Sequence, residues 1–581
     1  MDMSMQVVRI DCRTRTSARE ELPEELNVIG GRGLIDRVLS QEVPPLCEPL
    51  GQENKLIICC GPLAGAGITS AGRLSIGGKS PLTGGIKESN SGGTAADALA
   101  GLGIRCLILE NRPDQDLDRQ YPISAAGWSL LKVDESGVEF LDAAPYMGLG
   151  NYACRERLVA DFGDSYSTIT IGPSGEQLYL NSGLAVNDRY GRPGRFSARG
   201  GMGALMGSKR VKAILISNRG TYKPPRISSD GFKAARRRFH MIVMGSERIK
   251  VLREYGTAST VLDAQRLGAL PTCNFSVGQF SGAEKISGEA LHDLIAARGG
   301  EGTNSESCMG NCMIQCSNYF ADAKGRRVVG PLEYETLSLM GSNLGIDDLD
   351  TIARLNYICN DLGLDTIETG GALGVMAASG LLEFGDAQGF IDVLEDLPKG
   401  GLLGRMVGMG TGITARFLNV RHAPVVKNQC MSGYDPRGVK GTGVTYATTP
   451  MGADHTAGLT VYMPVDHHSR EGQVELSRKM QIGRTAYDVL GLCTFLMAAT
   501  ALHGDAVVDM LNGLYGLELP PDFLRQLGEE TIAMEKSYNR AAGFTAQDDR
   551  IPAYFREEKL PPFGLRWDIE DSEIDSMFGG A

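Results

Sequence analysis

The sequence contains no apolar run long enough to span a membrane. Its longest such stretch, residues 491–502, is about half of the roughly 20 residues that a transmembrane helix needs. No secretory signal is visible either, because charged side chains repeatedly interrupt the first 17 residues and no apolar core of 7–15 residues forms. We therefore expect a cytoplasmic protein without a membrane span.

An excess of basic residues is also missing. The chain has 58 Lys and Arg against 70 Asp and Glu, a net charge of -12, whereas a nucleic-acid binder usually presents a basic face. Two glycine motifs resemble nucleotide-binding motifs but do not match them. Residues 201–207 have one residue too many before the last glycine of a dinucleotide fingerprint, and residues 207–209 lack the adjacent Gly-Lys of a phosphate loop. We expect no nucleic acid partner and no such nucleotide site.

What the chain does have is glycine. Its 76 glycines are about 13% of 581 residues, where roughly 7% is average. Many cluster within the first 215 residues, between short β-type runs such as Leu56–Cys60 and residues 106–109 and 168–171. Short strands joined by glycine turns predict a β-rich domain whose backbone makes close contacts with other groups at several points.

Beyond about Lys212 the apolar residues recur three and four apart, as in amphipathic or buried helices. The clearest such segments are residues 229–255, 332–344, 349–362 and 475–501. We predict an α+β fold, with a β-rich N-terminal domain followed by two mainly helical domains. The expected bounds are 1–215, 216–425 and 426–581, and no internal repeat is visible.

Thirteen cysteines are scattered through this large chain, which favours thiol or metal roles over disulfides. Cys308, Cys312 and Cys316 lie in one polar loop and could bind one face of an iron–sulfur cluster if a fourth thiolate arrives from elsewhere. Zinc is the alternative, but it normally takes CxxC pairs or histidines, and no histidine lies between His292 and His422. Radical enzymes that use S-adenosylmethionine have CxxxCxxC instead. Incidental buried cysteines remain a third interpretation.

Two short segments resemble each other at a distance. The first Gly-Leu segment (residues 360–365) and the second Gly-Leu segment (residues 488–493) each follow a helical run and end in Gly-Leu plus a polar or thiol residue. On the simpler interpretation each is a helix end capped by glycine. As a pair they could present backbone amides and side chains to one ligand from opposite sides.

At this point the chain resembles the aldehyde:ferredoxin oxidoreductases through nearly its whole length. Apart from the Gly-Leu segments, the resemblance is carried by residues 30–34, 72–75, 79–84, 89–93, 171–176, 206–214, 270–275 and 333–336. It implies a tungsten or molybdenum ion held by two pyranopterins, whose phosphates a magnesium ion joins, and one [4Fe–4S] cluster. In that family the two Gly-Leu segments are paired pterin-binding motifs.

The resemblance also implies positions for the cofactor. The magnesium–phosphate bridge or the pterin edges are expected at Arg73, Asn90, Ala198 and Arg199; one pterin at Asn360, Gly363, Leu364 and Asp365; the other at Asp488, Gly491 and Leu492. Cys493 becomes the fourth cluster ligand beside Cys308, Cys312 and Cys316. The cluster and one pterin would then lie side by side for electron transfer.

For catalysis the family uses a glutamate and a histidine beside the metal, and the matching positions are Glu333 or Glu335 and His455. A carboxylate can accept a proton from water that attacks an aldehyde, and an imidazole can bind the carbonyl oxygen and pass protons. If residues 333–336 are extended, only one glutamate points inward, and we expect Glu335. The simpler interpretation is a surface glutamate pair and a packing histidine.

Three departures from the family pattern indicate a divergent branch. The cluster loop has CxxxC where CxxC is usual, Asn360 stands where an acid is common, and Met451 stands where arginine is common. The expected function is oxidation of an aldehyde to a carboxylic acid, with electrons passing to ferredoxin or a ferredoxin-like subunit in a homo- or hetero-oligomer. The alternatives are a reductase subunit of the benzoyl-CoA reductase type and a non-catalytic iron–sulfur protein.

Metal content provides the first test of these expectations. Four thiolates and two pterins imply about four irons and one tungsten or molybdenum per chain. Elemental analysis of anaerobically purified protein measures both. Stoichiometric zinc without iron would contradict the cluster and the pterin centre together.

Overall fold

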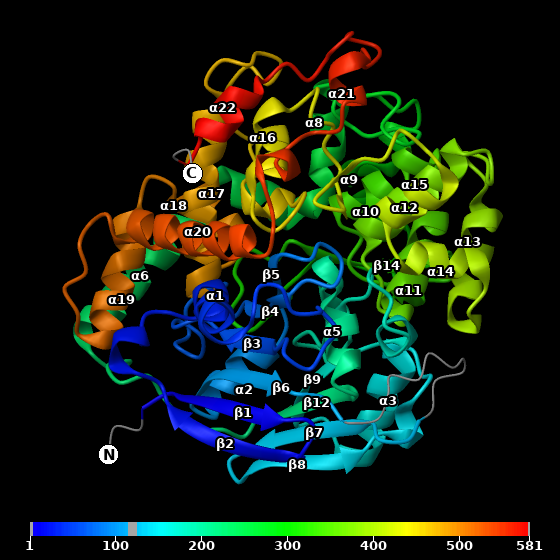
Figure 1. Ribbon diagram of the computed structural model, residues 1–581. Coiled ribbons are helices and arrows are strands. Elements are labelled where there is room, and N and C mark those ends of the chain that lie inside the picture. Colours follow the sequence, from blue (N-terminus) through cyan, green and yellow to red (C-terminus); the bar gives the residue numbers. More distant parts are fainter. Residues whose placement is uncertain (1–3, 114–124, 579–581) are drawn as a thin grey trace.

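The computed structural model describes residues 4–113 and 125–578. Two six-stranded sheets form the base of the molecule (Figure 1). The first sheet contains β1 (Gln6–Asp11), β2 (Thr16–Glu21), β3 (Leu56–Cys60), β4 (Leu74–Lys79), β5 (Ile86–Ser91) and β6 (Ile104–Glu110). The second contains β7 (Ser129–Asp134), β8 (Gly137–Asp142), β9 (Tyr166–Thr170), β10 (Leu184–Val186), β11 (Arg195–Ser197) and β12 (Val211–Ser217). The three strands expected from the sequence are present as β3, β6 and β9.

The two sheets have the same topology. The strand order is β2-β1-β6-β3-β4-β5 in the first and β8-β7-β12-β9-β10-β11 in the second, so corresponding strands occupy corresponding places. In each sheet one pair is parallel, β1 with β6 and β7 with β12, and the other pairs are antiparallel. The N-terminal region is therefore a structural duplication, although the sequence shows no repeat.

Burial explains the choice of residues in these strands. Every residue of β3 and of β12 is buried, as expected for strands covered on both faces. By contrast β2, at the sheet edge, is exposed at all six positions and carries charged side chains, which discourage pairing with another chain. The helices of this region are α1 (Gly31–Glu42), α2 (Ala95–Gly101), α3 (Asn151–Phe162), α4 (Pro173–Glu176) and α5 (Met202–Ser208).

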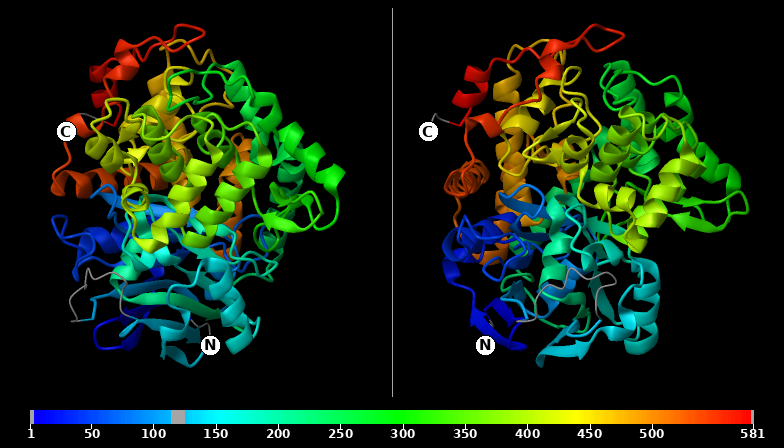
Figure 2. Two further views of the ribbon diagram at one scale, coloured as in Figure 1. Left: turned by 90° about the vertical axis from the view of Figure 1, so that its right-hand side faces the viewer. Right: turned by 45° about the vertical axis from the view of Figure 1, so that its right-hand side comes forward.

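The remaining chain is mainly helical and covers the sheets from one side (Figures 1 and 2). Its first helices are α6 (Asp230–Met244), α7 (Glu247–Tyr255), α8 (Thr260–Arg266), α9 (Gly288–Arg298), α10 (Tyr334–Leu339), α11 (Leu349–Leu362), α12 (Thr366–Ala378), α13 (Ala387–Asp396), α14 (Leu402–Gly408) and α15 (Thr411–Leu418). These are followed by α16 (Lys440–Thr448), α17 (Gln473–Leu490), α18 (Met497–Thr500), α19 (Gly504–Tyr515), α20 (Phe523–Ala541), α21 (Tyr554–Glu557) and α22 (Asp571–Ser576). Short strands form two small sheets, β13 (Thr303–Glu306) with β14 (Ser317–Ala321) and β15 (Arg327–Val329), and β16 (Val425–Val426) with β17 (Gln429–Cys430).

The α+β architecture expected from the sequence is confirmed, with differences at helix ends. The helix expected at 349–362 is α11, whereas the one expected at 229–255 is two helices, because α6 ends at Gly245. The segment expected at 475–501 ends as a helix at Leu490, where Gly491 takes the left-handed conformation that a non-glycine residue resists. Residues 332–333 precede α10 and are not helical.

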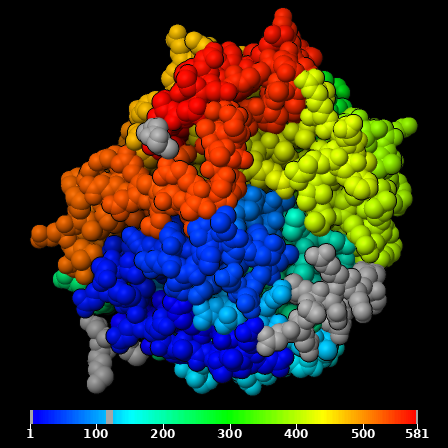
Figure 3. Space-filling view, in the orientation of Figure 1, coloured from blue at the N-terminus to red at the C-terminus, as the bar shows by residue number. Residues whose placement is uncertain are grey.

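The hydrophobic cores cross the expected domain limits. One core joins both sheets to residues of α17, α19 and α20, so the last quarter of the chain packs directly on the first. On the face seen in Figure 3 the orange and red C-terminal segments rest on the blue N-terminal region. A second core lies within residues 258–461 apart from Tyr179, and a third lies mostly within residues 426–577. The bounds near 215 and 425 stay a prediction.

Among the described residues no single helix is long and apolar enough to cross a membrane. One bent pair, residues 494–500 with α19, meets the length and composition criteria together, at an angle of 112°.

The ends of α11 and α17 lie against the two sheets at equivalent glycines. Gly61 follows β3 and Gly172 follows β9, and each is followed by proline. A Cβ atom at Gly61 would stand 2.2 Å from the carbonyl oxygen of Leu490, and one at Gly172 would stand 2.3 Å from that of Leu362. Neither position leaves room for a side chain, so both Gly-Leu segments depend on glycine for their docking.

We predict that Gly61→Ala destabilises the protein by about 1–3 kcal/mol or more, because the added methyl group must displace backbone. Gly231→Ala provides the control, since no atom lies within 4 Å of a Cβ there and the residue lies in α6. Thermal melting of both variants measures the difference. Equal melting temperatures would show that the Gly61 contact adjusts at little cost.

Candidate active site

A cavity of about 280 Å³ lies where the equivalent strands β5 and β11 meet. Ser91 on β5 and Ser197 on β11 join the two sheets there, with 3.2 Å between their hydroxyl oxygens. The walls come from both strands and from residues far along the chain. They include Arg73, Glu88, Ser89, Asn90, Arg195, Ala198, Arg199, Glu333, Glu335, Asn360, Leu364, Asp365, Asp454, His455 and Thr456. The cavity thus occupies the junction between the two copies of the duplicated fold.

The first Gly-Leu segment forms one side of this cavity. Gly363 caps α11 in the left-handed conformation, and its carbonyl oxygen accepts hydrogen bonds from the Gly183 amide and the Ser174 hydroxyl, each over 2.9 Å. Asn360, Leu364 and Asp365 line the cavity. The structure therefore places four residues implied for one pterin in a single turn, with three of them at the cavity wall.

The second Gly-Leu segment docks on the first sheet in the same way. Gly491 caps α17 in the left-handed conformation, and its carbonyl oxygen accepts from the Arg73 amide over 3.1 Å. Asp488 reaches the cavity wall through Asn90, whose Nδ2 donates to Asp488 Oδ1 over 3.1 Å. Asn90 in turn accepts from Arg73 Nε over 2.8 Å. The simpler interpretation, two glycine-capped helix ends, is correct for both segments, and the structure also brings both to one place.

Arg199 lies at the cavity wall, and its guanidinium group donates hydrogen bonds to other residues of the protein. Its Nε donates to Asp365 over 3.1 Å, and Nη1 and Nη2 donate to the carbonyl oxygens of Ala453 and Cys430 over 2.7 and 2.6 Å. Arg199 therefore ties the first Gly-Leu segment to the loops that carry His455. Ala198 beside it also lines the cavity.

Glu335 and His455 face each other in the cavity. Glu335 Oε1 lies 3.2 Å from His455 Nε2, while Oε2 accepts from the Gly433 amide over 2.6 Å. Ser432 Oγ lies 2.7 Å from His455 Nδ1 and orients the ring. Burial raises the pKa of Glu335 to about 8 and lowers the pKa of His455 to about 4. At neutral pH both groups are therefore largely uncharged.

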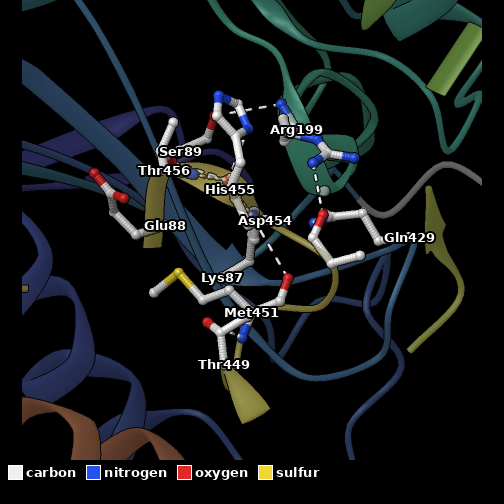
Figure 4. A network of polar contacts seen from close by, with 12 residues as sticks. Lys87, Glu88, Ser89, Arg199, Gln429, Thr449, Met451, Asp454, His455 and Thr456 are labelled. Atoms are coloured by element: carbon white, nitrogen blue, oxygen red, sulfur yellow. Dashed lines mark hydrogen bonds and ion pairs between the residues drawn. The ribbon is translucent and has the colours of Figure 1, made fainter. Parts of the chain in front are cut away.

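A buried ion pair holds the loop that carries His455 (Figure 4). Lys87 Nζ on β5 donates to Asp454 Oδ2 over 2.8 Å, and Asp454 Oδ1 accepts from the amide of Thr456 over 3.1 Å. Although burial opposes ionisation, the charges of Lys87 and Arg199 hold the pKa of Asp454 well below its usual range. Asp454 therefore stays charged and anchors the residue next to it.

Glu333 also lines the cavity and has different partners. It accepts a hydrogen bond from the Thr257 hydroxyl, and its Oε1 lies 4.0 Å from Arg195 Nη1. The condition of an extended segment is not met, because Glu333 precedes α10 and Glu335 lies in its first turn. Strand alternation therefore does not distinguish the two glutamates. Their contacts do, since Glu335 is the one beside His455.

The cysteine loop lies beside the second Gly-Leu segment. Ser70 connects them, because its carbonyl oxygen accepts from the Cys493 amide over 2.9 Å and its hydroxyl lies 3.4 Å from Cys312 Sγ. All four thiols implied for the cluster are buried, and electrostatic interactions link them. A hydrogen bond from Cys308 lowers the pKa of Cys312 to about 5, which favours the thiolate form that binds iron. Cys308 lies against Gly92 at the cavity wall.

The thiols are not placed as ligands of a single ion. In residues 4–113 and 125–578 no group of three or more His, Cys, Asp or Glu is arranged to hold one metal ion. A four-iron cube takes one thiolate at each of four corners, so its ligands stand farther apart than those of zinc. The donor set of four buried thiols fits such a cube.

The cavity wall also fits a polar cofactor. Glu88 Oε1 and Arg195 Nε are buried and have no hydrogen-bond partner among the described residues. Buried polar groups are nearly always hydrogen-bonded, so these atoms indicate that a polar ligand belongs here. A pterin offers ring nitrogens, an amino group and a phosphate as partners.

Comparison with known proteins gives the family. A profile described as the N-terminal domain of aldehyde ferredoxin oxidoreductase matches residues 7–218, and one described as its domains 2 and 3 matches residues 234–577. The chain belongs to the aldehyde ferredoxin oxidoreductase family. Membership confirms the resemblance seen in the sequence and makes the chain an oxidoreductase.

Several relatives of this chain in the aldehyde ferredoxin oxidoreductase family are known. Tungsten-containing aldehyde ferredoxin oxidoreductases from Pyrococcus furiosus and Thermococcus kodakarensis are 30% and 31% identical, and both alignments cover 95% of this chain and 91% of the relative. The WOR-like subunit of an aliphatic sulfonate oxidoreductase from Pyrococcus furiosus is 24% identical, over 90% of this chain and 84% of the relative. Among solved structures, the active site complex BamBC of benzoyl coenzyme A reductase shares the fold, with a TM-score of 0.78, 15% identity and coverage of 98% and 92%.

Sequence reasoning missed several residues of this site. Asp454 directly precedes His455, but its partner Lys87 is 367 positions away and carries no local signal. Glu88 and Arg195 are single charged residues in short strands, which pattern analysis takes as edge positions. Only the three-dimensional contacts identify them.

We predict that Cys493→Ser lowers the iron content and also disturbs the pterin, because Cys493 would bind the cluster while the residues just before it hold the cofactor. Cys359→Ser is the control, since Cys359 is equally buried but lies within α11. Iron analysis of both proteins decides the assignment. Equal iron loss in the two variants would mean that Cys493 is not the fourth ligand.

Proposed function

We propose that this protein oxidises aldehydes to carboxylic acids at a tungsten or molybdenum bis-pyranopterin centre in the cavity between β5 and β11. The observation that carries the proposal is the pair of Glu335 and His455, 3.2 Å apart and buried at the wall of that cavity. The names of the relatives support tungsten and aldehydes as the metal and substrate class. Bound there, the centre would accept the two electrons that leave the aldehyde.

The cofactor is held, in this proposal, by the two Gly-Leu segments. Asn360, Gly363, Leu364 and Asp365 bind one pterin, and Asp488, Gly491 and Leu492 bind the other, while Arg73, Asn90, Ala198 and Arg199 face the magnesium ion and the phosphates. The equivalent docking of the two segments on equivalent sheets supports a cofactor with two similar halves.

Glu335 and His455 move the protons of the reaction. An aldehyde and water yield a carboxylic acid, two protons and two electrons. Glu335, when ionised, accepts a proton from the attacking water, and His455 Nε2 passes a proton or binds the carbonyl oxygen. Ser432 and the ion pair of Lys87 with Asp454 keep His455 in place, which lets the pair work without rearrangement.

Electrons leave, in our proposal, through a [4Fe–4S] cluster bound by Cys308, Cys312, Cys316 and Cys493. Cys493 follows Leu492 directly, so the cluster and the second pterin are neighbours along the chain. Ferredoxin or a ferredoxin-like subunit then accepts the electrons. We place the reaction in the cytoplasm and expect a homo- or hetero-oligomer; the bounds 1–215, 216–425 and 426–581 remain our proposal for the domains.

We predict that Glu335→Gln and His455→Ala lower aldehyde turnover with a viologen acceptor by about 10²- to 10⁴-fold, the usual range for a general acid or base. Iron, tungsten and fold should be retained, as elemental analysis and circular dichroism will show. Glu333→Gln is the matched control and should lose little, because Glu333 is bound to Thr257 instead. A large loss at Glu333 with none at Glu335 would reverse their roles.

The pH dependence of kcat/KM provides a further test of the role of Glu335. Because burial raises the pKa of Glu335 to about 8, its carboxyl group is protonated below that pH and cannot accept a proton. Wild-type kcat/KM should therefore rise towards pH 8 and level off above it, and Glu335→Gln should lose this rise. If the metallated wild type has no aldehyde activity but an acyl-CoA reoxidises its reduced cluster, the reductase alternative replaces this function.

A further inference from the structure

Four large apolar side chains are exposed on α6, on α7 and just after α18. They are Met241, Met244, Val251 and Leu502, and 70% of Met241 and 92% of Leu502 are exposed. α18 contacts both α6 and α7, and α6 and α18 lie together at the left of Figure 1. We call this surface the α6–α7 face. Apolar side chains that gather at one exposed place mark an interaction site, whereas scattered ones need no explanation.

The α6–α7 face carries a surplus of positive charge on an acidic protein. Residues 230–255 contain seven Lys or Arg and three Asp or Glu, whereas the whole chain has 58 against 70. The two lysines and Arg238 are paired with acidic side chains, and the other four arginines form no ion pair with a described residue. One of these four, Arg237, is exposed one turn before Met241 on α6. The surface around the apolar side chains is therefore locally positive.

Arg253 connects the α6–α7 face to the cysteine loop. Its Nη2 lies 3.6 Å from Met244 Sδ and also donates to the carbonyl oxygen of Met313. Met313 directly follows Cys312 in the cysteine loop, and Asn311 just before it is exposed. The cysteine loop thus reaches the surface beside this face.

The fourth thiol proposed for the cluster leads to the same face along the chain. Cys493 is followed by a short helical turn at residues 494–496 and then by α18. Leu502 lies just beyond α18, nine positions after Cys493. The α6–α7 face therefore borders the proposed cluster from two directions, through the cysteine loop and through α18.

We propose that the α6–α7 face docks an acidic iron–sulfur protein that takes the electrons from the cluster. This rests on the proposed function, in which each aldehyde and a water yield a carboxylic acid, two protons and two electrons. The partner accepts these two electrons in two one-electron steps, and the two protons go to water. Electron transfer requires that the two clusters come close, and this face is where a partner can approach the cysteine loop.

Charge selects the partner and its orientation. An acidic protein is repelled by most of a chain of net charge -12 and attracted to its positive face, which orients it before contact. The apolar side chains then exclude water from the contact, and methionine and arginine are both enriched in protein interfaces. A second copy of this chain is the alternative occupant. In a symmetric contact it would place the same positive surplus opposite itself, which is unfavourable.

The test measures binding of a purified acidic ferredoxin with [4Fe–4S] clusters to the anaerobic holoenzyme by calorimetry at low salt. Met241→Glu and Arg237→Glu should each weaken binding about tenfold or more, the usual effect of losing an important interface residue. Added salt should weaken binding to the wild type more than to Arg237→Glu, because salt screens the attraction that this variant has already lost.

Turnover separates docking from chemistry. Aldehyde oxidation with a viologen needs no docking surface and should keep its wild-type rate in both variants, whereas the KM for the ferredoxin should rise. Leu402→Glu is the matched control, since it also places a glutamate at an exposed apolar position. Leu402 begins α14, on the opposite side of the molecule in Figure 1, and its variant should bind the ferredoxin as the wild type does.

Unchanged ferredoxin binding in both variants would overturn the proposal, and so would a wild type that reduces a viologen but does not bind the ferredoxin. If Met241→Glu changes the oligomeric state and leaves ferredoxin binding intact, the occupant is a second copy and the proposal fails. Binding that both variants weaken, in a metallated wild type without aldehyde oxidation, would refute the proposed function and support the docking face.

Discussion

The close backbone contact between two helix ends and two glycines is the constraint on which this structure depends. Gly61 and Gly172 occupy equivalent places in two sheets of the same topology. A Cβ atom at either would stand 2.2 or 2.3 Å from the carbonyl oxygen of the residue before a capping glycine. The Gly-Leu segments can therefore sit only where they do.

Burial then determines the chemistry of the cavity. Loss of water raises the pKa of Glu335 and lowers that of His455, so both groups are largely uncharged near neutral pH. Asp454 is kept ionised nearby by Lys87 and Arg199. Similar residue types thus take different protonation states within one small volume because their partners differ.

The sequence predicted the fold class and several elements well, because periodic apolar positions and glycine caps are local signals. α11 was predicted at its observed bounds, and β3 was recognised from five apolar residues. The break at Gly245 was missed, since a single glycine within a helical pattern is often tolerated. The duplication was invisible because strand order is preserved between the halves while the residues are not.

The site residues were likewise predicted where the sequence carries a local signal and missed where it does not. Residues in blocks shared with the family were found from the sequence, and the structure brings Glu335, His455, Asn360 and Asp365 to one cavity. Their roles still stand as predictions. Lys87 was missed because it pairs with a residue hundreds of positions away.

The shared core of the first sheet and the last helices has a consequence for biosynthesis. Strands β1 to β6 are made early, but α17, α19 and α20, which complete their apolar core, are made near the end. At about 5–20 residues per second, a ribosome needs tens of seconds to supply them. During that time the first sheet exposes an uncovered apolar face, and the second Gly-Leu segment has not yet closed the cavity. The nascent chain thus passes through a stage with exposed apolar surface, which favours aggregation.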